Sequence, residues 1–197
     1  MSMVLGPIHH WLYGKIGHQE ELTKALAAHA KAEGWIEDAG RFEKTLSPLE
    51  SVIDEGNIHG WLQAQISDAE ERYAALVCSL LAEDEGRLDS FCAAAAAFGE
   101  RHAIAPDADP EEAYRAFEDF FVNGMPCDRI NAVTAKEADH LSWEMTRDIH
   151  APYWAACKDG SAPYYALRKS VMDGMLNQTA LRLVMEDTAH YSIIKQS

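Results

Sequence analysis

The chain has 197 residues, of which 48% are hydrophobic and 25% are charged, a composition typical of a globular protein with one domain or two small ones. Its formal net charge of −15 disfavours binding to nucleic acids and to anionic membranes, because both are negatively charged themselves. The acidic residues are spread along the chain, so a solvated surface accounts for the charge without any special partner.

The first 125 residues have the pattern of a helical protein, with helices predicted over residues 7–32, 47–81, 85–102 and 109–123. The first helix begins at Pro7 and ends before Gly34. The second begins at the capping sequence Ser47-Pro48-Leu49-Glu50 and is interrupted near Gly56. The fourth begins at a similar signal, Asp109-Pro110-Glu111-Glu112.

After residue 125 the pattern changes to two hairpins that surround two short helices. The strands are predicted at 129–135, 141–147, 181–185 and 191–195, and the helices at 149–157 and 163–172. The second strand alternates clearly, with Leu141, Trp143 and Met145 on one face. We therefore expect an α+β fold in which a helical part, 1–125, and a small part with an antiparallel sheet, 126–197, form one compact unit.

A repeat within the chain is its most informative feature. Residues 8–26 and residues 58–76 align without a gap at an offset of 50, and nine of the nineteen positions are identical. The repeat places a His, a Trp and two Glu at equivalent points on two predicted helices. We expect these helices to form an antiparallel hairpin, since a short connection between helices favours that arrangement.

In such a hairpin, facing positions sum to about 79, which places His9 opposite Glu70 and His59 opposite Glu20. One interpretation is a pair of interhelical hydrogen bonds that fix the register of the two helices. A second is a metal or proton-transfer site formed by all four side chains, although only one Glu-x-x-His spacing of the kind used by di-iron proteins occurs in the chain. A third is a symmetry without a polar role, inherited from duplication or used at a subunit interface in a homo-oligomer.

A second candidate site lies where a predicted strand meets a predicted helix, at residues 146–154. Arg147, His150, Tyr153 and Trp154 offer a charge, a titratable base and aromatic walls, and this mixture suits a small anionic organic ligand. Asp148 would lie at the start of the helix beside them. The alternative is that Asp148 only caps the helix while the two aromatic side chains fill the core.

Residues 127–195 resemble the aminothiazoline-carboxylate hydrolase-like proteins in the order of their elements and in the sequence Trp143-Glu144-Met145-Thr146-Arg147. The resemblance implies a hydrolase fold with a cysteine directly after the Thr-Arg pair. In this chain that position is Asp148, so the nucleophile that the resemblance implies is missing. Cys127 and Cys157 are the nearest alternatives, and neither has a sequence context that marks a reactive thiolate.

The cysteines and the start of the chain predict the location. Cys78, Cys92, Cys127 and Cys157 form no CxxC pair, which disfavours a zinc knuckle and suits free thiols in a reducing cytoplasm. Residues 1–15 lack the basic start and continuous apolar core of a signal peptide. We therefore expect a cytoplasmic protein.

Three functional hypotheses remain from the sequence. The first is a hydrolase-like enzyme in which His150 acts as the base and Arg147 anchors an anionic substrate. The second is a non-catalytic protein that binds a small ligand in the same cleft, where the sheet meets the helices. The third is a metal-binding helical protein that uses His9, His59, Glu20 and Glu70.

Overall fold

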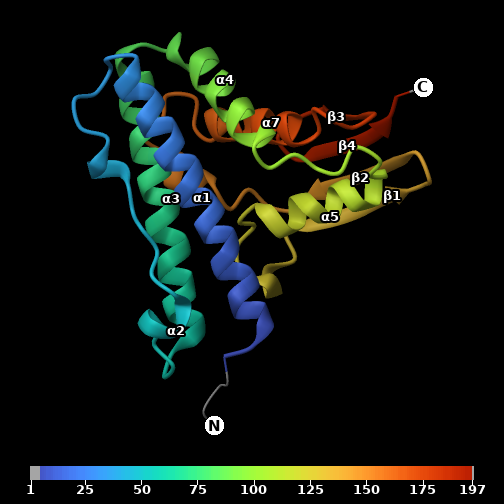
Figure 1. The fold of residues 1–197 in the computed structure, drawn as a ribbon, viewed down its shortest axis with the longest axis horizontal. Helices are drawn as coiled ribbons and strands as arrows, with labels where there is room; N and C mark the ends of the chain where they lie inside the picture. Colours follow the sequence, from blue (N-terminus) through green and yellow to red (C-terminus); the bar gives the residue numbers. More distant parts are fainter. Residues whose placement is uncertain (1–4, 197) are drawn as a thin grey trace.

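The computed structural model describes residues 5–196, which form a helical part followed by a small sheet (Figure 1). The elements are α1 Pro7–Ala32, η1 Gly40–Phe42, α2 Leu49–Val52, α3 Ile58–Glu83, α4 Arg87–Glu100, α5 Pro110–Phe120, η2 Pro126–Asp128, β1 Asn131–Lys136, β2 His140–Met145, α6 Ala151–Trp154, α7 Ala162–Met175, β3 Leu181–Met185 and β4 His190–Lys195. The predicted α+β class is confirmed.

The sheet is antiparallel throughout, with the strand order β1-β2-β4-β3, so the two predicted hairpins join through β2 and β4. Trp143 lies opposite Tyr191, and their rings stack with centroids 5.1 Å apart. The same face packs against α5, where Tyr114 and Phe117 contact the Trp143 ring. The opposite face carries polar residues such as Ser142, as the alternation in the sequence predicts.

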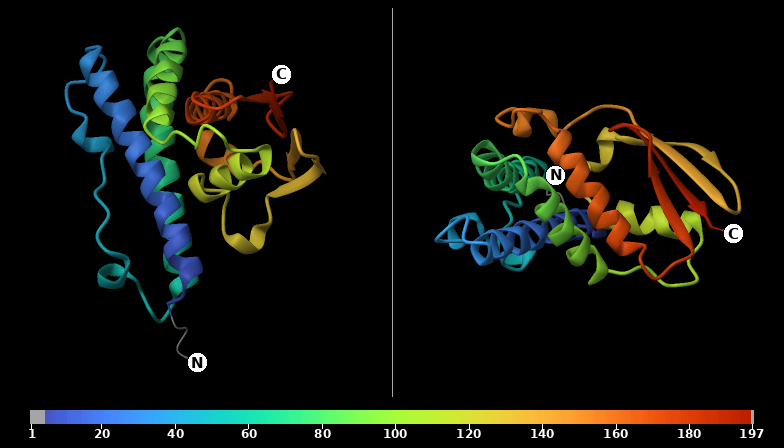
Figure 2. Two further views of the ribbon diagram at one scale, coloured as in Figure 1. Left: turned by 45° about the vertical axis from the view of Figure 1, so that its right-hand side comes forward. Right: turned by 90° about the horizontal axis from the view of Figure 1, so that it is seen from above.

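Helices α4 and α7 form a closely packed parallel pair (Figure 2). The contact depends on two glycines. A Cβ atom on Gly99 would lie 2.1 Å from the Val171 carbonyl oxygen, and one on Gly174 would lie 2.1 Å from that of Ala96. Only glycine allows the two backbones to approach this closely.

The two helices of the repeat are parallel, and the prediction of an antiparallel hairpin is wrong. Both run in the same direction in Figure 1, and the His9 and His59 rings lie 5.8 Å apart, as expected when residue i neighbours residue i+50. The reason is the connection between them, because residues 33–57 do not form a tight turn. They return along the full length of α1 through η1 and α2 before Asn57 caps α3.

A shared hydrophobic core connects the helical part with the sheet. It includes Leu26 of α1, Leu76 of α3, Phe117 of α5 and Trp143 of β2. A smaller cluster fills the lower end of the α1–α3 pair, where Val122 joins residues of both helices. The larger core cluster thus contains residues of both parts of the chain.

The cysteines differ from the sequence-based expectation of free thiols. Cys78 of α3 and Cys157, which follows α6, are joined by a disulfide, whereas Cys92 and Cys127 are free. The partners are 79 positions apart, and their proximity depends on how α6 docks on α3, which no local sequence pattern reveals. In residues 5–196, no helix combines the length and the apolar character required to cross a membrane.

Candidate functional site

A buried His–carboxylate pair lies at the centre of the molecule. The Nδ1 atom of His150 lies 3.0 Å from Oε1 of Glu70, and each side chain is only 1% exposed. The His150 ring also stacks on the ring of Tyr164, with centroids 3.9 Å apart. His150 Nε2 and Glu70 Oε2 are buried and have no hydrogen-bond partner among the described residues.

Asp148 holds the backbone that presents His150. Its carboxylate accepts hydrogen bonds from the backbone N–H groups of His150 and Ala151 and from the hydroxyls of Ser161 and Tyr165. Burial would raise the pKa of Asp148, but these hydrogen bonds outweigh it and hold the pKa below its usual value. The predicted helix 149–157 shortens to α6, Ala151–Trp154, which directly follows His150.

A cavity of about 270 Å³, here called the outer cavity, opens beside the pair between α3 and the segments that follow α5 and β2. Its chemically useful residues are Glu70, Asp128, Arg147, His150 and Tyr153. Arg147 is 65% exposed, and its Nη2 atom lies 3.8 Å from Oδ1 of Asp128. The Tyr153 hydroxyl lies 2.9 Å from the Ser67 hydroxyl of α3. Three residues predicted from the 146–154 junction, Arg147, His150 and Tyr153, therefore line one cavity.

The other two residues predicted at the junction do not line the outer cavity. Trp154 is fully buried, and its ring packs edge-on against Tyr73 with centroids 5.0 Å apart. Asp148 caps the turn, as described above. Trp154 thus fills the core, and Asp148 holds the turn before α6, whose N-cap residue is His150.

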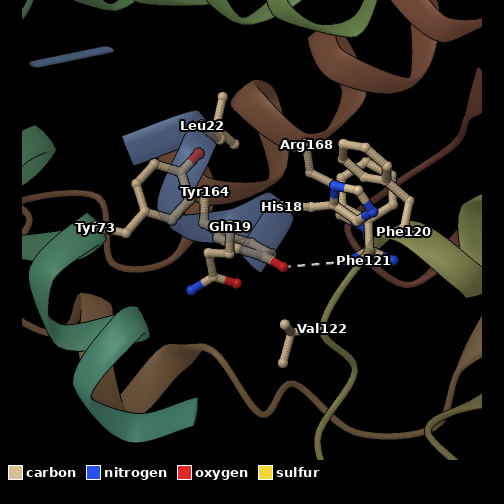
Figure 3. Close-up of a pocket in the computed structure, with 9 residues that line it drawn as sticks. All are labelled: His18, Gln19, Leu22, Tyr73, Phe120, Phe121, Val122, Tyr164 and Arg168. Atoms are coloured by element: carbon tan, nitrogen blue, oxygen red, sulfur yellow. Dashed lines mark hydrogen bonds between the residues drawn. The ribbon is translucent and has the colours of Figure 1, made fainter. Parts of the chain in front are cut away.

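Val122 lines both the outer cavity and a smaller cavity of about 20 Å³, enough for one water molecule. Figure 3 shows Arg168 of α7 reaching toward the Tyr164 hydroxyl, to which its Nη1 atom donates a hydrogen bond of 3.1 Å. The guanidinium also lies 4.5 Å from the Phe121 ring centre. Burial raises the pKa of Tyr164, so its hydroxyl stays protonated at neutral pH. Tyr164 thus links the His150 ring, on which it stacks, to Arg168 of α7.

The four residues of the proposed metal site are not brought together. His9 and His59 lie side by side, but Glu20 and Glu70 are eleven positions further along the parallel helices, about 16 Å at 1.5 Å per residue. Glu20 faces Arg72 instead, with Oε2 3.4 Å from Nε, and Glu70 faces His150. The reciprocal pairing of His9 with Glu70 and of His59 with Glu20 is therefore wrong. Within residues 5–196, no group of three or more potential ligands is placed to hold a metal ion.

Sequence reasoning identified His150 but missed its partners. Glu70 was expected to face His9, and Tyr164 and Arg168 are, from sequence, simply two residues of a predicted helix. Their spacing of four positions places them on one face of that helix, and this is the only local signal of their contact.

The geometry of the pair defines its chemistry. When Nδ1 carries the proton toward Glu70, the lone pair on Nε2 is free to accept a proton, and the carboxylate stabilises the imidazolium that forms. Comparison of the chain with protein family models, with curated proteins and with solved structures gave no match.

Proposed function

We propose that this protein binds a small anionic organic molecule in the outer cavity, where Arg147 pairs with the anionic group and the His150–Glu70 pair exchanges a proton with the ligand. The observation that carries the proposal is the buried pair with its unpartnered Nε2 atom, located beside a cavity that also contains an exposed guanidinium. Buried titratable pairs of this kind are common at functional sites.

Charge in the outer cavity supports an anionic ligand rather than a cationic one. The Glu70 carboxylate is already directed at His150, whereas Arg147 has only a loose contact of 3.8 Å with Asp128. A planar guanidinium at the mouth of a cavity suits a carboxylate or phosphate, to which it donates two parallel hydrogen bonds. Tyr153 supplies an aromatic wall for the organic part of the ligand.

Catalysis in this site would not follow the route that the family resemblance implies. Asp148 occupies the place of the expected cysteine, and its carboxylate accepts four hydrogen bonds outside the outer cavity. Cys157 is bound to Cys78. A hydrolase-like reaction in this cavity would therefore use His150 as a general base on a water molecule, with Glu70 as its orienting carboxylate. The resemblance to the hydrolase-like family and the cytoplasmic location remain predictions.

The proposal is tested by calorimetric titration with small carboxylates such as succinate and benzoate, and with phosphate, at low ionic strength. Arg147→Gln should weaken binding about 10–100-fold, which corresponds to the loss of a hydrogen bond between charged groups. Arg147→Lys should bind with intermediate affinity, because Lys keeps the charge but loses the planar fork.

Arg182→Gln is the matched control for these titrations. Arg182 is an exposed residue of β3, so this variant loses the same charge far from the outer cavity. Equal affinity of wild type, Arg147→Gln and Arg182→Gln for every probe would contradict the proposal. A search by mass spectrometry for small molecules that copurify with the chain would identify the ligand class directly.

A further inference from the structure

A third cavity lies on the other side of the segment that lines the outer cavity, and Gly124 contacts both. Its volume is about 170 Å³, and it is an open cavity lined by the first turns of α1, the end of α5 and residues 123–131. We call it the α1 cavity. The residues that give it chemical character are Trp11, Lys15, Glu118, Asn123, Arg129 and Asn131.

Two cations line the α1 cavity, and neither is paired with a carboxylate of the described residues within 4.0 Å. Lys15 is only 3% exposed, and its Nζ atom lies 3.9 Å from the centre of the Trp11 ring. Burial lowers the pKa of Lys15 to about 8, against the opposing effect of Glu118, so the ammonium is still mostly charged at pH 7. Since the Trp11 ring is the partner that the structure gives the Lys15 ammonium, an anionic group in the cavity would add a charge partner for it.

Asn123 and Asn131 line the same cavity, and the side-chain oxygen of each is buried without a partner among the described residues. Asn123 and Asn131 each donate a hydrogen bond from Nδ2 to Oε1 of Glu118, at 3.1 and 2.5 Å. This arrangement fixes the orientation of both amides and leaves their Oδ1 atoms buried and without a donor among the described residues. Buried carbonyl oxygens normally accept a hydrogen bond, so the pair favours a ligand that carries N–H groups.

The backbone at Arg129 gives independent support for a built site. In residues 5–196, Arg129 is the one non-glycine residue with a positive φ, at 48° with ψ at 51°. Such a conformation costs energy for a residue with a Cβ atom and is enriched at ligand sites. Here it turns the chain out of η2 and into β1, so that Arg129 and Asn131 line one cavity.

We propose that the α1 cavity binds the zwitterionic head of a small α-amino acid. The carboxylate of the ligand pairs with Lys15 and Arg129. Its ammonium donates to the Oδ1 atoms of Asn123 and Asn131, close to the negative charge of Glu118. The cavity volume of about 170 Å³ suits the head group and a short side chain, which the Trp11 ring would cover.

Calorimetric titration of the full chain at pH 7 tests this proposal with glycine, L-alanine and L-tryptophan. Propionate and ethylamine serve as analogues that keep only one of the two charges. In the Arg147→Gln background, which removes carboxylate binding in the outer cavity, glycine and L-alanine should bind. The two analogues should bind there at least about tenfold more weakly, because each leaves one set of partners unsatisfied. L-Tryptophan should bind more weakly than L-alanine, because most of its side chain would extend beyond a cavity of about 170 Å³.

The variants separate this site from the outer cavity. Arg129→Gln changes an exposed side chain, so the chain should fold normally and lose affinity for L-alanine at least about tenfold. Asn131→Ala should cause a loss of similar size, while Arg147→Gln, in the outer cavity, should leave L-alanine binding unchanged. In a second measurement, L-alanine should slow the acetylation of Lys15 but not that of exposed Lys158.

Two results would overturn the proposal. One is the absence of binding by both glycine and L-alanine up to about 10 mM, a concentration above the weak millimolar range of affinities. The other is an affinity that does not change in Arg129→Gln or Asn131→Ala and does not change when propionate replaces L-alanine. Failure of the outer-cavity probes would not produce either result, because those titrations use different ligands and a different arginine.

Discussion

His150 and Glu70 are 80 positions apart in the chain, yet Nδ1 of one lies 3.0 Å from Oε1 of the other in a nearly fully buried site. The contact joins α3 to the turn between β2 and α6, so it connects the helical part of the molecule with the sheet. Removal of one partner of a buried pair lowers stability strongly, because the remaining polar group stays buried without a hydrogen-bond partner.

We expect Glu70→Ala to lower the free energy of unfolding by about 1–3 kcal/mol, the range for a buried polar group that loses its partner. The measurement is denaturant unfolding of Glu70→Ala, His150→Ala and the double variant. A coupling energy of about 0.5–3 kcal/mol between the two sites would confirm the interaction. Strictly additive effects would contradict it.

His59→Ala is the matched control for the buried pair. The sequence-based pairing of His59 with Glu20 would make this substitution costly, but His59 is exposed and lies next to His9. We therefore expect a change within about 0.5 kcal/mol, as is usual for an exposed side chain. A loss as large as that of Glu70→Ala would indicate a buried role for His59.

The sequence predicted the elements well because their signals are local. The capping sequence at Asp109 starts α5 with both reciprocal hydrogen bonds to Glu112, and the alternation in 141–145 matches the buried face of β2. The direction of the second repeat helix has no local signal. The same repeat is compatible with a parallel or an antiparallel pair, and only the path of residues 33–57 decides between them.

The candidate site could be predicted only in part for the same reason. Arg147, His150 and Tyr153 are close in sequence, so a strand-to-helix junction brings them together. Glu70 and Tyr164 come from distant helices, and their contacts with His150 depend on tertiary packing. The residues of the α1 cavity likewise come from three separate segments.

The glycine crossing of α4 and α7 gives a second prediction. Gly99→Ala would place a Cβ atom 2.1 Å from a backbone oxygen of α7, so the helices must separate, and we expect a loss of about 1–3 kcal/mol or more. Gly14→Ala is the control. Gly14 is an exposed residue of α1, and no atom of another element lies within 4 Å of the position that its Cβ would take. This control substitution should instead stabilise the protein by about 0.5–1 kcal/mol. If Gly99→Ala and Gly14→Ala had equal effects on thermal unfolding, the close packing of α4 against α7 would be contradicted.

The Asp148 cap predicts a dependence of stability on pH. Its pKa is lower in the folded chain than in the unfolded chain, so the ionised carboxylate stabilises the fold above the unfolded pKa of about 3.9. This contribution is lost as the pH falls through the lower, folded pKa. Because the carboxylate is partly exposed, Asp148→Asn should cost only about 1 kcal/mol at pH 7, and the difference from wild type should shrink below about pH 4.

Unfolding in urea at several pH values tests this expectation for Asp148→Asn. The control is Asp159→Asn on the exposed turn before α7, which should match wild type within about 0.5 kcal/mol at every pH. A difference between wild type and Asp148→Asn that grows toward low pH would have the wrong sign and would exclude the proposed role of the carboxylate.

The Cys78–Cys157 disulfide gives the last prediction. It ties α3, two turns beyond Glu70, to the end of the segment that begins at His150, so it holds together the two elements that form the buried pair. Cys78→Ser combined with Cys157→Ser should lower the free energy of unfolding by about 2–5 kcal/mol, and a reducing agent should have the same effect on wild type. Cys127→Ser, which removes an exposed free thiol, should change little. A non-reduced digest that contains the peptide pair would confirm the bond, whereas four reactive thiols in the native chain would exclude it.

Alkylation inside cells also tests the predicted cytoplasmic location, because lasting disulfides are rare in that compartment. Free Cys78 and Cys157 in cells would agree with the cytoplasm, and a bonded pair would indicate an oxidising compartment.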